Sequence, residues 1–298
     1  MKAISIVMPV FNSERFIGTA VESCLSGLCP GEVELIVVDD GSTDATPDVL
    51  AAFHNHSDVR VLRQDNAGPA AARNRGIAAS DALFIAFLDA DDFYLPGTIA
   101  KFLEAAALGE GRVSLFFCDY LRADSEGNHM GMVRVRPPLS GPALFQQFLL
   151  PKAFPVLTST VLVERRALVE LSGFDERFLR CQDLELFTRM VGAYPMQKLD
   201  LCSTVRRSHG AQLTGQRREI IHWREECNIA FLRRIPFEKF CGRSDKIGLA
   251  TAAEAFGDIM LRAEEPLPRT ARYLYEMAQR ISPDARLRGK IDAARALL

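Results

Sequence analysis

The chain has 298 residues, of which 48% are hydrophobic and 25% are charged, and its formal net charge is -2. This length suits a large α/β domain with a smaller appendage, and the composition is that of a globular protein with a sizeable core. Because the charge is nearly balanced, no basic field points to nucleic acid, and we expect no nucleic-acid partner.

Short apolar runs alternate with helical patterns over the first 120 residues. We expect strands over residues 4–8, 34–38, 59–62, 83–88 and 113–120, with helices between them that begin near residues 16, 47, 67 and 96. This alternation predicts an α/β fold in which helices cover both faces of a mostly parallel central sheet.

The pattern loosens after residue 120. We expect a hairpin or loop over residues 123–132, a strand over 156–163, and helices over 165–172 and 184–191. From residue 219 onwards the chain reads as helical. The sequence therefore predicts one domain over residues 1–218, with halves 1–120 and 121–218, and a helical region over 219–298.

The cysteines and the apolar runs bear on the compartment. The seven cysteines are scattered and no two have C-x-x-C spacing, so we expect reduced thiols. No apolar run approaches the length of a membrane span, and Pro9 and Asn12 interrupt the first run too early for a signal peptide. We expect a cytoplasmic protein that could still rest on the inner face of the membrane.

Polar clusters follow three of the predicted strands, at residues 9–12, 39–44 and 89–92. In open α/β sheets, ligands bind at the carboxyl ends of the strands. We therefore expect these clusters to line one crevice.

The cluster at residues 89–92 contains several carboxylates directly after a buried strand. Asp89 and Asp91 are two residues apart and would project to the same side of an extended backbone. A hard cation such as Mg²⁺ or Mn²⁺ would relieve their repulsion and could bind phosphate oxygens. The alternative is a solvated acidic turn.

Two other groups of residues are candidates for nucleotide binding. Asp39 and Asp40 could accept hydrogen bonds from a nucleobase or a ribose hydroxyl, although turn and cap roles would also explain them. Arg73 follows a run of small residues and could contact a diphosphate bidentately; the alternative is a surface arginine.

Together these segments resemble the family 2 glycosyltransferases of the GT-A fold. The motifs that carry the resemblance are residues 5–12 (SIVMPVFN), 37–44 (VVDDGSTD), 66–74 (NAGPAAARN), 87–92 (FLDADD), 172–176 (SGFDE), and 182–186 (QDLEL) with Arg189. Each motif alone is a weak to moderate signal, but their order over about the first 190 residues makes chance a poor explanation.

The resemblance implies site roles for the matching positions. The residues it assigns to nucleotide-sugar binding are Pro9, Val10, Phe11, Asn12, Asp39, Asp40, Arg73, Asp89 and Ala90. Asp91 would hold the metal ion, Mn²⁺ or Mg²⁺, on the diphosphate. His209 lies where many relatives carry a basic or histidine-containing loop, so it could complete the metal shell; a surface histidine is the alternative.

Asp183 would be the catalytic base that takes the proton of the acceptor hydroxyl. Without the resemblance, a carboxylate that complements a helix dipole would be the simpler interpretation. Gln182 departs from the commonest family pattern, which has glutamate before the aspartate. That change leaves the base in place but puts its pKa and its contacts in doubt.

The resemblance implies inverting transfer of one sugar from a nucleotide-sugar donor. The donor expected from the family is a UDP-sugar. The acceptor would be a glycan, a lipid-linked molecule or a small molecule in polysaccharide or glycoconjugate synthesis. A nucleotidyltransferase and a catalytically silent nucleotide-sugar-binding protein are the alternatives. A processive synthase is disfavoured because the sequence lacks both a Q-x-x-R-W motif and a membrane span.

Overall fold

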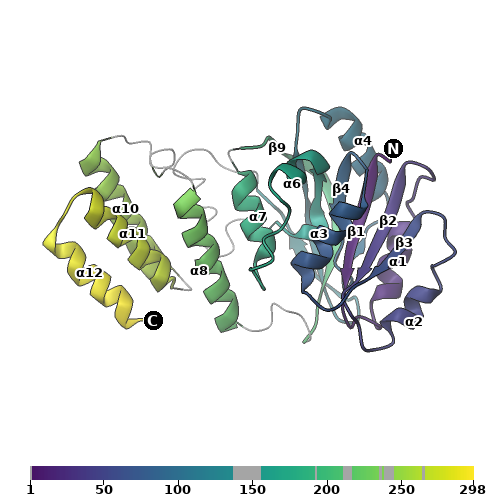
Figure 1. Ribbon diagram of the computed structural model, residues 1–298, viewed down its shortest axis with the longest axis horizontal. Helices are drawn as coiled ribbons and strands as arrows, with labels where there is room; N and C mark the ends of the chain where they lie inside the picture. Colours follow the sequence, from purple (N-terminus) through teal and green to yellow (C-terminus); the bar gives the residue numbers. More distant parts are fainter. Residues whose placement is uncertain are drawn as a thin grey trace. The chain divides into compact units, whose positions relative to one another are not determined.

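The computed structural model describes residues 2–136, 156–191, 193–210, 217–234, 237, 245–263 and 266–298. They form two compact units, each described by itself (Figure 1). The first unit contains the described residues up to 210 and the second contains those from 217 onwards. The predicted half at 121–218 includes residues 137–155 and 211–216, which lie outside the described residues.

Within the described residues of the first unit, nine strands form one mixed sheet in the order β3-β2-β1-β4-β8-β6-β9-β5, with β7 paired to β6. The strands are β1 (Ile4–Val10), β2 (Val33–Asp39), β3 (Val59–Arg63), β4 (Phe84–Phe87), β5 (Phe93–Tyr94), β6 (Leu115–Asp124), β7 (His129–Val133), β8 (Val161–Glu164) and β9 (Met196–Ser208). β1 to β4 pair in parallel, and so do β6 and β9, whereas β8 runs antiparallel to both β4 and β6.

Helices cover both faces of the sheet, as predicted (Figure 1). The helices of this unit are α1 (Ile17–Leu25), α2 (Thr46–Ala51), α3 (Pro69–Ala79), α4 (Thr98–Gly109), the 3₁₀ helix η1 (Thr158–Thr160), α6 (Arg165–Glu170) and α7 (Gln182–Met190). Leu35 and Val37 of β2 belong to a core cluster that includes residues of α1 and α4, while the alternate residues Ile36 and Val38 belong to a cluster with residues of α3. This alternation follows from the two-residue period of a strand.

Two segments differ from the sequence-based expectation, and a third takes one of the two forms expected for it. Residues 158–160 form η1, so the strand predicted over 156–163 is shortened to β8. The segment 123–132 belongs to a hairpin of β6 and β7, one of the two forms expected there. β9 was not predicted at all, because its first half is amphipathic and its second half carries arginines.

The second unit is helical in its described residues, with α8 (Arg217–Arg234), α10 (Lys246–Arg262), α11 (Pro268–Ile281) and α12 (Ala285–Ala296). Its core includes Phe231, Met260, Leu274 and Tyr275. None of the helices in the described part of the chain is both long and apolar enough to cross a membrane.

Candidate active site

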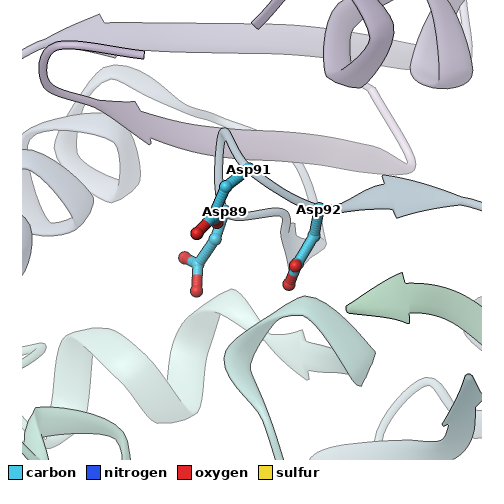
Figure 2. A group of neighbouring side chains, drawn as sticks. All are labelled: Asp89, Asp91 and Asp92. Atoms are coloured by element: carbon cyan, nitrogen blue, oxygen red, sulfur yellow. The ribbon is translucent and has the colours of Figure 1, made fainter. Parts of the chain in front are cut away.

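The acidic cluster is built on a tight turn that follows β4. The Asp92 N–H donates a hydrogen bond to the Asp89 carbonyl at 2.9 Å. As a result Asp89, Asp91 and Asp92 each place a carboxylate oxygen within 4.8 Å of the others, and all three side chains point to the same side of the loop (Figure 2). The expected extended backbone was therefore wrong, and the turn adds Asp92 to the pair predicted from spacing.

Asp92 is the buried member of the acidic turn. Its carboxylate accepts hydrogen bonds from Ser159 Oγ at 2.7 Å and from the Arg207 backbone N–H at 3.2 Å. Burial raises the pKa of Asp92 well above its usual range, and the charges of Asp91 and Asp89 raise it further. This repulsion is the cost that a bound cation would remove.

His209 lies beside the acidic turn, directly after β9. Its Nε2 atom is 3.0 Å from Asp91 Oδ2, and its side chain is only 13% exposed. The ring stacks on Phe16 with a centroid distance of 4.6 Å. The imidazole is therefore partly buried and held against a candidate metal ligand.

Arg73 is buried at 6% exposure, which excludes the alternative of a surface arginine. Its Nη2 atom donates to Asp89 Oδ1 at 2.6 Å, and its guanidinium lies 5.4 Å from the centre of the Phe174 ring. Its Nε–H is buried without a partner among the described residues. An unpaired buried donor is costly, and an oxygen of a bound ligand would satisfy it.

Asp183 lies in the first turn of α7, which begins immediately after Cys181 in the left-handed conformation (φ 57°). Its Oδ1 atom accepts the Leu184 N–H at 2.8 Å. Burial raises the pKa of Asp183, against the lowering effects of that hydrogen bond and of the Arg73 charge, and the Asp89 charge raises it as well. The charges of Arg73 and Asp89 thus act on the pKa of Asp183 in opposite directions, and burial outweighs both.

The Asp40 carboxylate accepts hydrogen bonds from the segment that leads into α3. Its Oδ1 atom accepts from Gln64 Nε2 at 2.7 Å and from the Ala67 N–H at 2.9 Å, and its Oδ2 atom accepts from the Gly68 N–H at 2.8 Å. Gly68 has a φ of 90°, which favours glycine. A carboxylate offers about four acceptor positions, so these three bonds leave one for a ligand.

Asp39 has the turn role that was one of its two interpretations. It accepts from the Ser42 N–H at 2.9 Å and from Arg63 Nη1 at 2.9 Å. Both of its carboxylate oxygens are therefore used inside the protein.

The candidate base-pocket residues meet Asp39 and Asp40 because β1 and β2 are neighbours. Val10 pairs with Asp39, and Pro9 pairs with Val38. Asn12 is left-handed (φ 47°), and its Oδ1 atom accepts the Thr43 N–H at 2.8 Å. Phe11 is 46% exposed and Asn12 is exposed as well, whereas Ala90, in the acidic turn, belongs to the buried hydrophobic core.

The comparison with known protein families decides the assignment. The sequence profile of Glycosyl transferase family 2 matches residues 5–171, which is more than half of the chain. The chain belongs to glycosyl transferase family 2. The predicted family is therefore confirmed.

Two curated relatives of this family 2 protein align with different fractions of its length. An uncharacterized glycosyltransferase of Haemophilus influenzae is 33% identical over 171 residues, which are 56% of this chain and 64% of the relative. The succinoglycan biosynthesis protein ExoU of Rhizobium meliloti is 41% identical over 102 residues, which are 34% of this chain and 29% of ExoU. The matches thus span less than two thirds of these relatives' own lengths.

Two solved structures share the fold of this family 2 chain. TarS of S. aureus, residues 1–349 with UDP-GlcNAc, aligns with a TM-score of 0.58 and 18% identity, covering 99% of this chain and 79% of TarS. The mannosyltransferase PcManGT of Pyrobaculum calidifontis, with GDP-Man and Mn²⁺, aligns with a TM-score of 0.60 and 17% identity, covering 98% and 84%. The predicted α/β fold of the GT-A type is confirmed.

Several residues that border the acidic turn of this family 2 site were not predicted from the sequence. Ser159 Oγ accepts the Asp89 N–H at 3.1 Å and donates to Asp92, and Thr158 Oγ1 lies 3.4 Å from Asp89 Oδ2. The polar run of residues 158–160 within an otherwise apolar segment was the available signal. The position of Arg207 carried no such signal, because it depends on β9.

Proposed function

We propose that this family 2 protein transfers one hexose from a nucleotide-sugar donor to an acceptor hydroxyl, with inversion at the anomeric carbon and with Mn²⁺ or Mg²⁺ as cofactor. The observation that carries the proposal is the acidic turn, whose Asp89 is bonded to the buried Arg73 and raises the pKa of Asp183. Three acidic side chains, one arginine and one desolvated carboxylate supply the groups that sugar transfer from a diphosphate needs.

The acidic turn fits a hard divalent cation. Its carboxylate oxygens lie within 4.8 Å of one another, and oxygen donors are the ligands that Mg²⁺ and Mn²⁺ prefer. Asp91 would hold the ion, with His209 as a further donor. When bound, the ion would stabilise the negative charge on the departing nucleoside diphosphate.

The nucleotide sugar would be held by side chains at the ends of β1, β2 and β4. Residues 9–12, with the free acceptor position of Asp40, would receive the base, and we propose uracil because TarS holds UDP-GlcNAc. The unpaired Nε–H of Arg73 would donate to the diphosphate or the sugar. Asp89 and Ala90 would lie against the ribose or the sugar, while Asp39 would keep its turn role beside the base.

Asp183 would take the proton of the acceptor hydroxyl as that oxygen attacks the anomeric carbon. The raised pKa strengthens Asp183 as a base, because a base is most efficient when its pKa lies near the working pH. One base and direct displacement require no carboxylate nucleophile, so the product would have the inverted configuration.

The proposed acceptor and the kind of biosynthesis are based on the relatives of this protein. ExoU is a succinoglycan biosynthesis protein, so we propose a glycan, lipid-linked or small-molecule acceptor in polysaccharide or glycoconjugate synthesis. Residues 1–218 would form the catalytic domain and 219–298 a helical extension. The scattered cysteines favour the cytoplasm, where the protein could rest on the inner face of the membrane.

The proposal is tested in two steps. A thermal-shift panel of UDP- and GDP-sugars, with and without Mn²⁺, should show one donor that raises the melting temperature only with the metal. That donor is then incubated with an acceptor panel, and proton NMR reads the anomeric configuration of the product. Asp91→Asn is the matched variant that should lose the metal-dependent shift.

Each outcome has a defined meaning. Metal-dependent transfer with inversion supports the proposal. Pyrophosphate release from a nucleoside triphosphate and a sugar phosphate would indicate a nucleotidyltransferase, and donor binding without turnover on any acceptor would indicate a binding protein. A product with the retained configuration would contradict the mechanism.

A further inference from the structure

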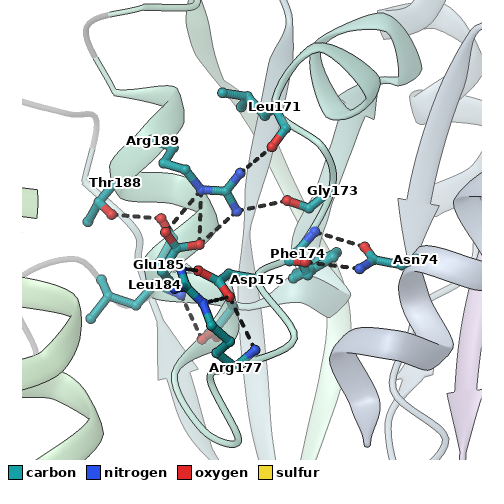
Figure 3. Close-up of polar contacts among 11 residues, drawn as sticks. Asn74, Leu171, Gly173, Phe174, Asp175, Arg177, Leu184, Glu185, Thr188 and Arg189 are labelled. Atoms are coloured by element: carbon teal, nitrogen blue, oxygen red, sulfur yellow. Dashed lines mark hydrogen bonds and ion pairs between the residues drawn. The ribbon is translucent and has the colours of Figure 1, made fainter. Parts of the chain in front are cut away.

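Hydrogen bonds join the loop between α6 and α7 to two helices, α7 and α3 (Figure 3). On the α7 side, the Arg189 guanidinium donates to the Leu171 carbonyl and to the Gly173 carbonyl, each at 2.7 Å. Its Nε atom contacts both carboxylate oxygens of Glu185, which is completely buried. Arg189 therefore ties α7 to the loop through these two carbonyls, and the ion pair with Glu185 on the same helix holds its guanidinium in place.

On the α3 side, Asn74 holds the same loop. Its Oδ1 atom accepts the Phe174 N–H at 2.8 Å, and its Nδ2 atom donates to the Phe174 carbonyl at 2.9 Å and to Glu176 at 2.8 Å. The side-chain amide thus pairs with the backbone of Phe174 in both directions. Such a pair fixes the spacing as well as the orientation of the two segments.

Gly173 allows this close approach. Its φ is +66°, and a Cβ atom built on it would lie 2.3 Å from Asn74 Oδ1. Any side chain at position 173 would therefore displace Asn74. The Phe174 ring completes the contact, because it packs against Phe87 of β4 and against the Arg73 guanidinium, at 5.4 Å in each case.

The two ends of this set of contacts are adjacent in sequence to the two sides of the site. Asn74 follows Arg73, which is bonded to Asp89, and Glu185 lies two residues after Asp183. Among the described residues, the Asp183 carboxylate accepts a hydrogen bond from its neighbour, the Leu184 N–H, and α7 begins without a side-chain cap. The placement of Asp183 therefore depends on how α7 is held.

We propose that Asn74, Gly173, Glu185 and Arg189 form an α7 latch, a set of positioning residues that fixes the Asp183 carboxylate against the donor side of the site. The latch deepens the proposed function and rests on it for the role of Asp183. It fixes the distance between the catalytic base Asp183 and the donor sugar. Other residues bind the nucleotide and the metal.

Asn74→Leu is the variant that tests the latch, because it keeps the side chain's size and removes all three hydrogen bonds. Arg189→Ala would leave the buried Glu185 charge unpaired, so it is expected to compromise folding instead. Arg177→Ala is the matched control: Arg177 pairs with Asp175 in the same loop, but its side chain is 83% exposed.

Two measurements are made on the full chain. Hydrogen exchange of the free protein should show faster exchange at residues 182–187 in Asn74→Leu and parental exchange in Arg177→Ala. With the donor found above, kcat of Asn74→Leu should fall about a hundredfold, the cost of a misplacement near 1 Å. The donor KM and the Mn²⁺ dependence should stay at parental values.

The latch is overturned if residues 182–187 of Asn74→Leu exchange at the parental rate, or if the donor KM rises while kcat stays unchanged. A parent protein that transfers no sugar would contradict the proposed function alone, because the exchange experiment needs no substrate and still decides whether Asn74 holds α7.

Discussion

The Nε2 atom of His209 lies 3.0 Å from Asp91 Oδ2, although the two residues are 118 positions apart in the sequence. The contact joins the end of β9 to the turn after β4. If His209 is a ligand of the proposed cation, the site would take donors from two segments, and its affinity could be tested from either side.

We predict that His209→Ala weakens Mn²⁺ binding by at least about tenfold, because an imidazole held against a metal ligand supports the site. Asp91→Ala should abolish Mn²⁺-dependent binding of the nucleoside diphosphate. Titration calorimetry measures both, with His129→Ala as the control, since His129 is exposed on β7. Parental Mn²⁺ affinity in Asp91→Ala would exclude Asp91 as a ligand.

Asp40→Ala should both destabilise the protein and weaken donor binding. The substitution leaves Gln64 Nε2 and the N–H groups of Ala67 and Gly68 without their acceptor. We expect a loss of about 1–3 kcal/mol in unfolding free energy and a higher donor KM. Urea unfolding and donor kinetics measure these, with the exposed Asp81→Ala as the control. If only stability changes, Asp40 does not contact the donor.

Gly76→Ala tests the packing of α3 on β1. A Cβ atom at Gly76 would lie 2.3 Å from Val7 Cγ1, so the helix must move, and we expect a loss of about 1–3 kcal/mol. Gly289→Ala in α12 has open space around its Cβ and should be neutral or stabilising by up to about 1 kcal/mol. Similar unfolding free energies for the two variants would contradict the close packing.

The sequence predicted β1 to β4 and β6 because each contains a short apolar run, whereas the two-residue strand β5 was not predicted. Strand ends at Val10, Asp39 and Phe87 place residues 9–12, Asp39, Asp40 and the acidic turn along one edge of the parallel strands. For Asp89 and Asp91 the nearness was predicted for the wrong reason, since a turn and not an extended backbone brings them together.

The other parts of the site were harder to predict from the sequence, because they depend on pairing between strands that are far apart in the chain. β9 brings Arg207 and His209 to the acidic turn, and η1, directly before β8, carries Ser159, yet no local pattern shows which strands these segments would lie beside. The raised pKa of Asp183 comes from burial by the folded chain and has no local signal at all.

The acidic limb of the pH–rate profile should reflect that raised pKa. If the Asp183 carboxylate is the base, kcat is low while Asp183 is protonated and rises as the pH passes its pKa. Burial moves this pKa upwards, so the limb should lie at higher pH than for an exposed aspartate. A limb at the usual position of an exposed carboxyl would indicate another group.

The most direct test of the account is the rate of sugar transfer by Asp183→Asn. The amide oxygen can still accept the Leu184 N–H, so the fold should be kept, and Asp200→Asn, exposed on β9, is the control. We predict that kcat falls by about two to four orders of magnitude, while the donor dissociation constant and the Mn²⁺ dependence stay at parental values. Near-parental turnover by Asp183→Asn would contradict the assignment of Asp183 as the base.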